Sequence, residues 1–290
     1  MSELIVSSRP DLRRPVLVAA FRGWNDGGQG ATLGAGYLAR QWGAESFAEI
    51  ESENFYDFQA VRPLVSLEEG LTRKLEWPEN TFLHAPIPDL DRDAVILIGV
   101  EPNLRWKTYS GLVLELVQEL GVELVVTLGS LLADVPHTRP APVSAAASDA
   151  GLVEELGVEP SRYEGPTGIV GIVQDACTRA GVPALSIWAA VPHYVAQPPC
   201  PKATLALLRH IEDLLDVPIP LGDLPEDARA WERGVDELAS EDEEVADYVR
   251  SLEEAKDLAK APEASGDAIA REFERYLRRR GNDEPGRLTD

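Results

Sequence analysis

The sequence predicts an α/β fold, a doubly wound and mostly parallel sheet with helices on both faces. Four short apolar runs rich in β-branched residues have the pattern of strands buried on both faces: 16–21, 94–100, 122–130 and 184–191. Segments of helical length and 3.6-residue period alternate with them, at 29–42, 106–120, 167–180 and 202–215. Strands that alternate with helices in this way are typical of a doubly wound sheet.

The ends of the predicted helices carry suitable residues. Gly121 and Gly181 follow the second and third helical segments, and glycine readily adopts the left-handed conformation that ends many helices. Thr167 is a natural N-cap for the third helix, and Pro201 resembles the first residue of the fourth.

Residues 55–83 interrupt the alternation. VRPLVSL and LTRKLEW flank the short turn EEG, which indicates a β-hairpin insertion. A two-stranded arm cannot bury both of its faces alone. It is therefore expected either to fold back on its own domain or to reach a neighbouring subunit, and we favour the second arrangement.

The composition changes after the proline-rich stretch 217–220. Apolar residues then recur at helical spacing over 224–238, 245–252 and 269–277, which predicts three amphipathic helices. Ser240 and Glu243 have the spacing of a capping box for the middle helix. We expect an α/β core domain at 1–220 and an acidic helical lid at 221–290, whose last residues, 281–290, form a frayed tail.

The charge and the cysteine content restrict the functional class. The net charge of −23 repels nucleic acid and anionic lipid, so neither is expected as a partner. No apolar run approaches the roughly 20 residues that span a bilayer, and no signal peptide is evident, so a soluble protein is expected. Two cysteines without metal-ligand spacing indicate a reduced, cytoplasmic compartment.

Each of the four predicted strands ends in polar or aromatic residues. The carboxyl ends of parallel strands meet at one edge of a sheet, where ligands of such folds bind. We therefore expect a pocket at this edge. Its candidate residues are Trp24, Asn25, Asp26, Gly27, Glu101, Asp134, His137, Arg139, Tyr163, Thr167, His193 and Tyr194.

The glycine-rich loop after the first strand does not fit a dinucleotide site. Gly28, Gly30 and Gly34 are spaced one residue too far apart for the usual fingerprint, and Asp26 would repel a pyrophosphate. The amides that follow could still hold a carboxylate or phosphate. In the alternative interpretation, Asn25 and Asp26 cap the following helix while Trp24 packs beneath the rim, and capping is the favoured role for Asp26.

The loop after the third strand carries an acid, a possible base and a cation. Asp134, His137 and Arg139 could act together in acid–base chemistry, or they could form an internal salt-bridge network that stiffens the loop, and we favour the network slightly. A triad of Ser130, His137 and Asp134 is weakly supported, because Ser130 lacks the G-x-S-x-G context of a hydrolase elbow.

The remaining motifs favour modest roles. The amides before Ile169 could form a second anion site, although a simple loop and cap is favoured there. His193 beside Tyr194 is more typical of a hydrogen-bonded rim residue than of a catalyst. No metal-binding or ATP-binding motif is present, so no cofactor and no metal are expected.

Four segments together resemble the proteasome assembly chaperone 2 family in its actinobacterial form. They are GWNDGG, LLADVPHTRP, YEGPTGI and VPHYVAQPPCPKAT, and the resemblance extends over about residues 12–215. It implies a fold similar to that of purine nucleoside phosphorylases, a covered pocket at the strand ends and homo-oligomers, with a trimer as one arrangement.

The resemblance also implies an assembly or protein-interaction factor whose partners include proteasome subunits. Relatives dock through a C-terminal tail of a hydrophobic residue, tyrosine and any residue, which Leu288, Thr289 and Asp290 do not match. The alternative is a ligand-binding protein or an enzyme of phosphorylase or hydrolase type, acting on a small molecule such as a nucleoside or a peptide. Whether the protein is an enzyme stays open at this point.

Overall fold

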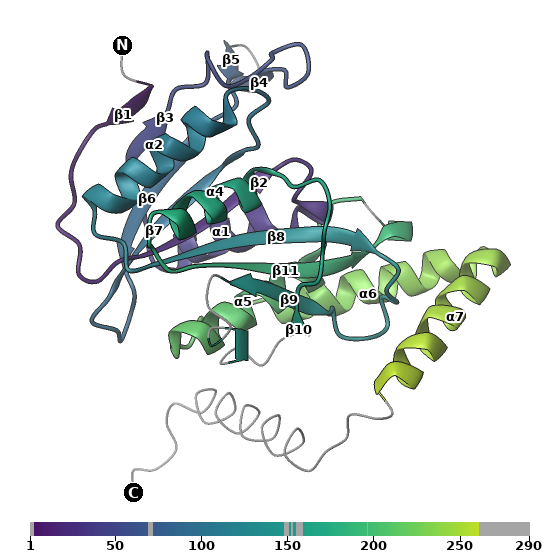
Figure 1. Cartoon of the computed structure of the whole chain (residues 1–290). Coiled ribbons are helices and arrows are strands. Elements are labelled where there is room, and N and C mark those ends of the chain that lie inside the picture. The colour runs from purple at the N-terminus through teal and green to yellow at the C-terminus, as the bar shows by residue number, and fades with distance from the viewer. Residues whose placement is uncertain are drawn as a thin grey trace, which may run out of the picture.

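A nine-stranded sheet forms the centre of the molecule (Figure 1). The computed structural model describes residues 3–68, 72–147, 151, 153–154, 159–195 and 197–260. The strands in spatial order are β1 (Leu4–Val6), β3 (Glu45–Ile50), β6 (Asn80–Pro86), β7 (Asp93–Val100), β2 (Val16–Arg22), β8 (Leu124–Ala133), β11 (Ala184–Pro192), β9 (Val143–Ala147) and β10 (Glu159–Pro160).

The four central strands β7, β2, β8 and β11 are mutually parallel. They are the four apolar runs expected from the sequence, which confirms the predicted parallel core. The flanking strands were not predicted, and β6 and β9 run antiparallel to their central neighbours β7 and β11.

Helices cover both faces of this sheet, as a doubly wound fold requires. Two clusters of buried side chains lie on opposite faces, and β2 alternates between them, with Val18 in one cluster and Leu17 in the other. Helices α1 (Gly30–Gln41) and α5 (Pro201–Leu215) pack on one face, and α2 (Trp106–Glu119) and α4 (Ile169–Arg179) on the other. Gly121 and Gly181 follow α2 and α4 with φ of 66° and 78°, in the left-handed region expected of them.

The predicted hairpin is present and stands apart from the main sheet. Strands β4 (Leu64–Glu68) and β5 (Thr72–Glu76) pair antiparallel in a sheet of their own. At its base the rings of Phe58 and Trp77 lie 4.9 Å apart in an edge-to-face contact. The hairpin is narrower than the segment 55–83, because Phe55 is buried in the core and residues from Asn80 onward belong to β6.

Two of the expected C-terminal helices follow, α6 (Leu224–Ser240) and α7 (Glu243–Lys260), and Figure 1 shows α7 turning away from the line of α6. The capping-box prediction is wrong, because α6 extends through Ser240, whose Oγ donates to the Glu237 carbonyl oxygen at 2.7 Å. Asp242 caps α7 instead, and its Oδ1 accepts from the Glu244 amide at 2.9 Å. The expected helix at 269–277 and the tail lie outside the described residues.

No helix within the described ranges has the length and apolar character needed to cross a membrane.

Candidate functional site

The loop after β2 is fixed to the neighbouring strand and helix by Asp26. This side chain is 7% exposed, and its Oδ1 accepts hydrogen bonds from the amides of Ala31 and Thr32 at 2.9 and 3.2 Å. The Thr32 hydroxyl donates to Oδ2 at 2.5 Å, and the Ser130 hydroxyl donates to Oδ1 at 3.3 Å. Asp26 therefore caps the start of α1, which confirms its favoured role. Burial raises the pKa of this carboxyl group above 3.8, although the hydrogen bonds act in the opposite direction.

The glycines of this loop have a steric role. Gly28 has φ of 60°, and a Cβ atom at this position would lie 2.7 Å from the Cβ of Cys200. The Gly28 carbonyl oxygen accepts from the Cys200 amide at 2.8 Å, directly before α5. Because Gly28 has no side chain, the loop can pack closely against the N-terminus of α5.

Glu101, at the end of β7, joins the same loop to α4. Its Oε1 accepts from Asn25 Nδ2 at 2.7 Å and from the Ile169 amide at 2.9 Å, and its Oε2 accepts from the Trp24 amide at 3.2 Å. The carboxylate caps α4 from a distant strand. The prediction that Thr167 caps this helix is wrong, since α4 begins after Gly168 and Glu101 already takes the first amide.

Two further rim residues point outward. Trp24, which one interpretation placed beneath the rim, has 65% of its surface exposed, whereas its neighbour Asn25 is buried. Tyr163 is also 65% exposed, and its hydroxyl donates to the Pro166 carbonyl oxygen at 2.8 Å.

The two helix starts considered as anion sites are thus occupied by carboxylates of the chain. Asp26 takes the amides of α1, and Glu101 takes the first amide of α4. A negative side chain at a helix N-terminus is electrostatically favoured, and it fills the place where a phosphate would bind.

The loop after β8 forms a second group of polar contacts with the rim. His137 is 1% exposed, and its amide donates to the Tyr194 oxygen at 2.8 Å. The Tyr194 hydroxyl also lies 2.8 Å from His137 Nδ1, and His137 Nε2 lies 2.9 Å from Asp236 Oδ1. Burial raises the pKa of the Tyr194 hydroxyl to about 12.

The outer part of this loop contacts residues from distant segments. His193 Nδ1 lies 3.1 Å from Asp134 Oδ1, and the Tyr248 hydroxyl of α7 donates to the same oxygen at 3.1 Å. Arg139 binds Glu253 and Asp257 of α7. The prediction of an internal network among Asp134, His137 and Arg139 is wrong, because each of them forms its ion pair with a residue of another element: His193, Asp236, and Glu253 with Asp257, respectively.

The proposed hydrolase triad is also wrong. The Ser130 hydroxyl donates to the Gly27 carbonyl oxygen at 2.8 Å. Both ring nitrogens of His137 are engaged by Tyr194 and Asp236, so the imidazole is not available to Ser130.

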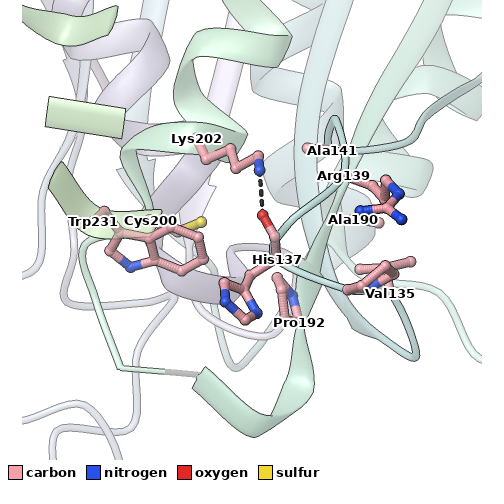
Figure 2. Close-up of a pocket in the computed structure, with 10 residues that line it drawn as sticks. Val135, His137, Arg139, Ala141, Ala190, Pro192, Cys200, Lys202 and Trp231 are labelled. Atoms are coloured by element: carbon pink, nitrogen blue, oxygen red, sulfur yellow. Dashed lines mark hydrogen bonds between the residues drawn. The ribbon is translucent and has the colours of Figure 1, made fainter. Parts of the chain in front are cut away.

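A small hollow lies beneath α6 (Figure 2). Figure 2 shows the Lys202 ammonium group reaching the His137 carbonyl oxygen, with Cys200 and Trp231 to one side. The space is no larger than a site for about one water molecule. The lining residues are Val135, Pro136, His137, Arg139, Ala141, Ala190, Pro192, Cys200, Lys202 and Trp231.

His137 and Arg139 are the members of the predicted set that line this hollow. Sequence reasoning missed Lys202 and Trp231. The position of Lys202 next to Pro201 placed it in the first turn of α5 and could have indicated that it lies near the rim. In the part of the chain that the structure describes, no group of three or more His, Cys, Asp or Glu residues could hold a metal ion.

The fold and the rim define an α/β protein whose strand-end loops are bound by its own carboxylates and contact the C-terminal helices α6 and α7. The chain belongs to the PAC2 family, whose sequence pattern matches residues 20–239. No curated protein matches the chain in sequence.

Solved structures agree with this assignment. A PAC2 family protein from Streptomyces avermitilis is 54% identical with a TM-score of 0.74, and the match covers 81% of this chain and 99% of that one. A proteasome-assembly chaperone homologue from Mycobacterium tuberculosis is 52% identical with a TM-score of 0.75 and the same coverage. An archaeal proteasome activator from Pyrococcus furiosus, 23% identical with a TM-score of 0.65 over 81% of this chain and 97% of that one, shares the fold.

Proposed function

We propose that this protein is a proteasome assembly or interaction factor. The observation that carries the proposal is the 52% identity to the proteasome-assembly chaperone homologue of Mycobacterium tuberculosis, over 99% of that chain. Membership of the PAC2 family over residues 20–239 supports it.

The geometry of the rim favours protein contact over small-molecule binding. Both helix starts hold the chain's own carboxylates, and the hollow beneath α6 accommodates about one water molecule. Large apolar side chains are exposed around the strand ends, and exposed apolar groups are a feature of interaction surfaces. These residues are Trp24, Leu104, Leu131, Leu132 and Tyr163. We infer that the predicted site residues frame a surface for a protein partner, and no specific observation favours the phosphorylase or hydrolase alternative.

The hairpin supports self-association as a further part of this proposal. Val65 pairs with Leu75, so these side chains and that of Leu67 lie on one face of the hairpin, with exposures of 56%, 57% and 62%. An apolar face of this kind is stabilised when a second copy of the chain covers it. We infer a homo-oligomer that uses this face, with a trimer as the arrangement to test first.

The remaining parts of the proposal concern domain division and compartment. We infer that 1–220 folds as the body and that the helices after 220 act as a lid on the rim, since α6 and α7 contact the loop after β8. Cys177 and Cys200 are free and buried, which is consistent with a reduced, cytoplasmic compartment.

An assembly assay with purified proteasome α and β subunits tests the proposed function. We expect the protein to form a complex with one subunit type and to change the rate of ring formation on native gels. Trp24→Ala should weaken this effect, while Leu238→Ala, which truncates an exposed apolar side chain on α6, should leave it unchanged. Absence of both a complex and an effect on ring formation would overturn the proposal.

A further inference from the structure

Helices α6 and α7 each present two acidic residues, four positions apart, to basic groups of the body. The pair on α6 is Glu232 and Asp236, and the pair on α7 is Glu253 and Asp257. Residues four positions apart lie on the same face of a helix, so each helix offers two carboxylates side by side.

The α6 pair binds the buried side of the rim. Glu232 Oε2 lies 2.7 Å from Lys202 Nζ, and Asp236 Oδ1 lies 2.9 Å from His137 Nε2. The side chain of Lys202 is 14% exposed and that of His137 is 1% exposed. Helix α6 also buries Ala228, Val235 and Ala239 and packs against α5, so apolar contacts hold it in place as well.

The α7 pair binds Arg139 in a forked arrangement. Arg139 Nε and Nη2 donate to the two carboxylate oxygens of Asp257 at 3.1 and 2.8 Å, and Nη1 donates to Glu253 Oε1 at 3.1 Å. The Thr138 hydroxyl donates to the same Glu253 oxygen. A planar guanidinium group that donates two parallel hydrogen bonds recognises the two oxygens of a carboxylate selectively.

Helix α7 has few other attachments. Val249 is its buried apolar side chain in the described part of the chain, and Leu258 is 74% exposed. Its aromatic contact is Tyr248, which packs edge to face against His193 and Tyr194. Elements with little buried apolar surface open at low free-energy cost, so α7 is the separable part of the lid.

We propose that Thr138 and Arg139 form a docking site for an acidic helix of a partner protein, and that α7 occupies this site from within the same chain. The partner helix carries two carboxylates four residues apart, as α7 does, and binds when α7 moves away. Charge complementarity in the structure supports this occupant: in a chain with a net charge of −23, the Arg139 guanidinium group offers a basic site here, and an acidic helix covers it.

Peptide binding to the full-length chain tests the proposal. The probe is a fluorescently labelled peptide with the sequence of residues 243–260. Fluorescence anisotropy measures its binding to the protein. We expect Glu253→Gln with Asp257→Asn to release α7 and to bind the peptide about tenfold more tightly than the wild type, because the wild-type site is filled internally. The matched control, Glu243→Gln with Glu254→Gln, removes the same charge from exposed positions of α7 and should bind like the wild type.

Two substitutions of Arg139 test whether its guanidinium group binds the peptide. Arg139→Gln, added to the released variant, should abolish binding, and Arg139→Lys should weaken it because a lysine keeps the charge but loses the fork. Hydrogen exchange of α7 and thermal melting establish that the variants are folded and that α7 is open. The proposal is overturned if the open, folded variant does not bind the peptide, or if binding persists without Arg139. It is also overturned if a peptide with glutamine at the positions of Glu253 and Asp257 binds equally well.

Discussion

The side-chain amide of Asn25 and the carboxylate of Glu101 meet at 2.7 Å, although 76 positions separate them in the chain. The same carboxylate accepts from the first amide of α4, so one side chain links the ends of two central strands to a helix.

Replacement of Glu101 by alanine should destabilise the protein. The change leaves Asn25 Nδ2 and the Ile169 amide without their acceptor, and we expect a loss of about 2–4 kcal/mol in the free energy of unfolding. Urea unfolding measures it. Glu115→Ala, at an exposed position of α2, is the control and should change stability by no more than about 0.5 kcal/mol. Equal stabilities of the two variants would contradict the linking role of Glu101.

Stability should depend on pH through Asp26. Burial raises the pKa of this carboxyl group above 3.8 in the folded state, so folding favours the protonated form. Its contribution is therefore fully present below pH 3.8 and is lost as the pH rises through the raised pKa. Asp26→Asn removes this titration. Urea unfolding of both proteins between pH 3.5 and about 7 should show the wild type losing stability relative to the variant as the pH rises. A difference that stays constant with pH would contradict the prediction.

Both cysteines should resist thiol reagents in the folded protein. Burial raises the pKa of Cys177 to about 11, and burial also raises the pKa of Cys200, so the reactive thiolate is scarce near neutral pH. Ellman's reagent should react slowly with the native protein and should titrate two thiols in denaturant. Rapid reaction of the native chain would show that one of these sites is open.

The two faces of the hairpin should differ in their effect on self-association. Leu67→Thr alters the face shared with Val65 and Leu75, whereas Leu64→Thr alters the opposite face at similar exposure. Threonine preserves strand propensity in both variants. Sedimentation velocity over a range of concentrations should show weaker association for Leu67→Thr alone. The proposed contact would be contradicted if the wild type were monomeric at all concentrations, or if both substitutions had equal effects.

The core of the fold was predictable because its signals are local. The runs at 16–21 and 184–191 are continuous and β-branched, which is the pattern of strands covered on both faces. The flanking strands lack this pattern. Strand β9 is Val-Ser-Ala-Ala-Ala, whose residues have weak strand propensity on average, and it forms because β11 offers it an edge.

The contacts of the site were likewise predictable only where the two partners are close together in the sequence. Asp26 caps amides five and six residues away, so its role could be read from the sequence nearby. Glu101 caps an amide 68 residues away, and only the spatial order of the strands brings the two together. The acidic partners of Arg139 lie 114 and 118 residues further along the chain, in α7, which carries many other acids. Periodicity alone did not reveal which of these acids face the body.

Shortening the Glu101 side chain would also free the carboxylate position at the start of α4. A family member with a short neutral residue at this position would have an unfilled receptor at the start of α4, lined by the amides of Ile169 and Asn25. Formate or acetate supplied from solution would then take the place of the missing carboxylate, and its binding would restore stability in a concentration-dependent way.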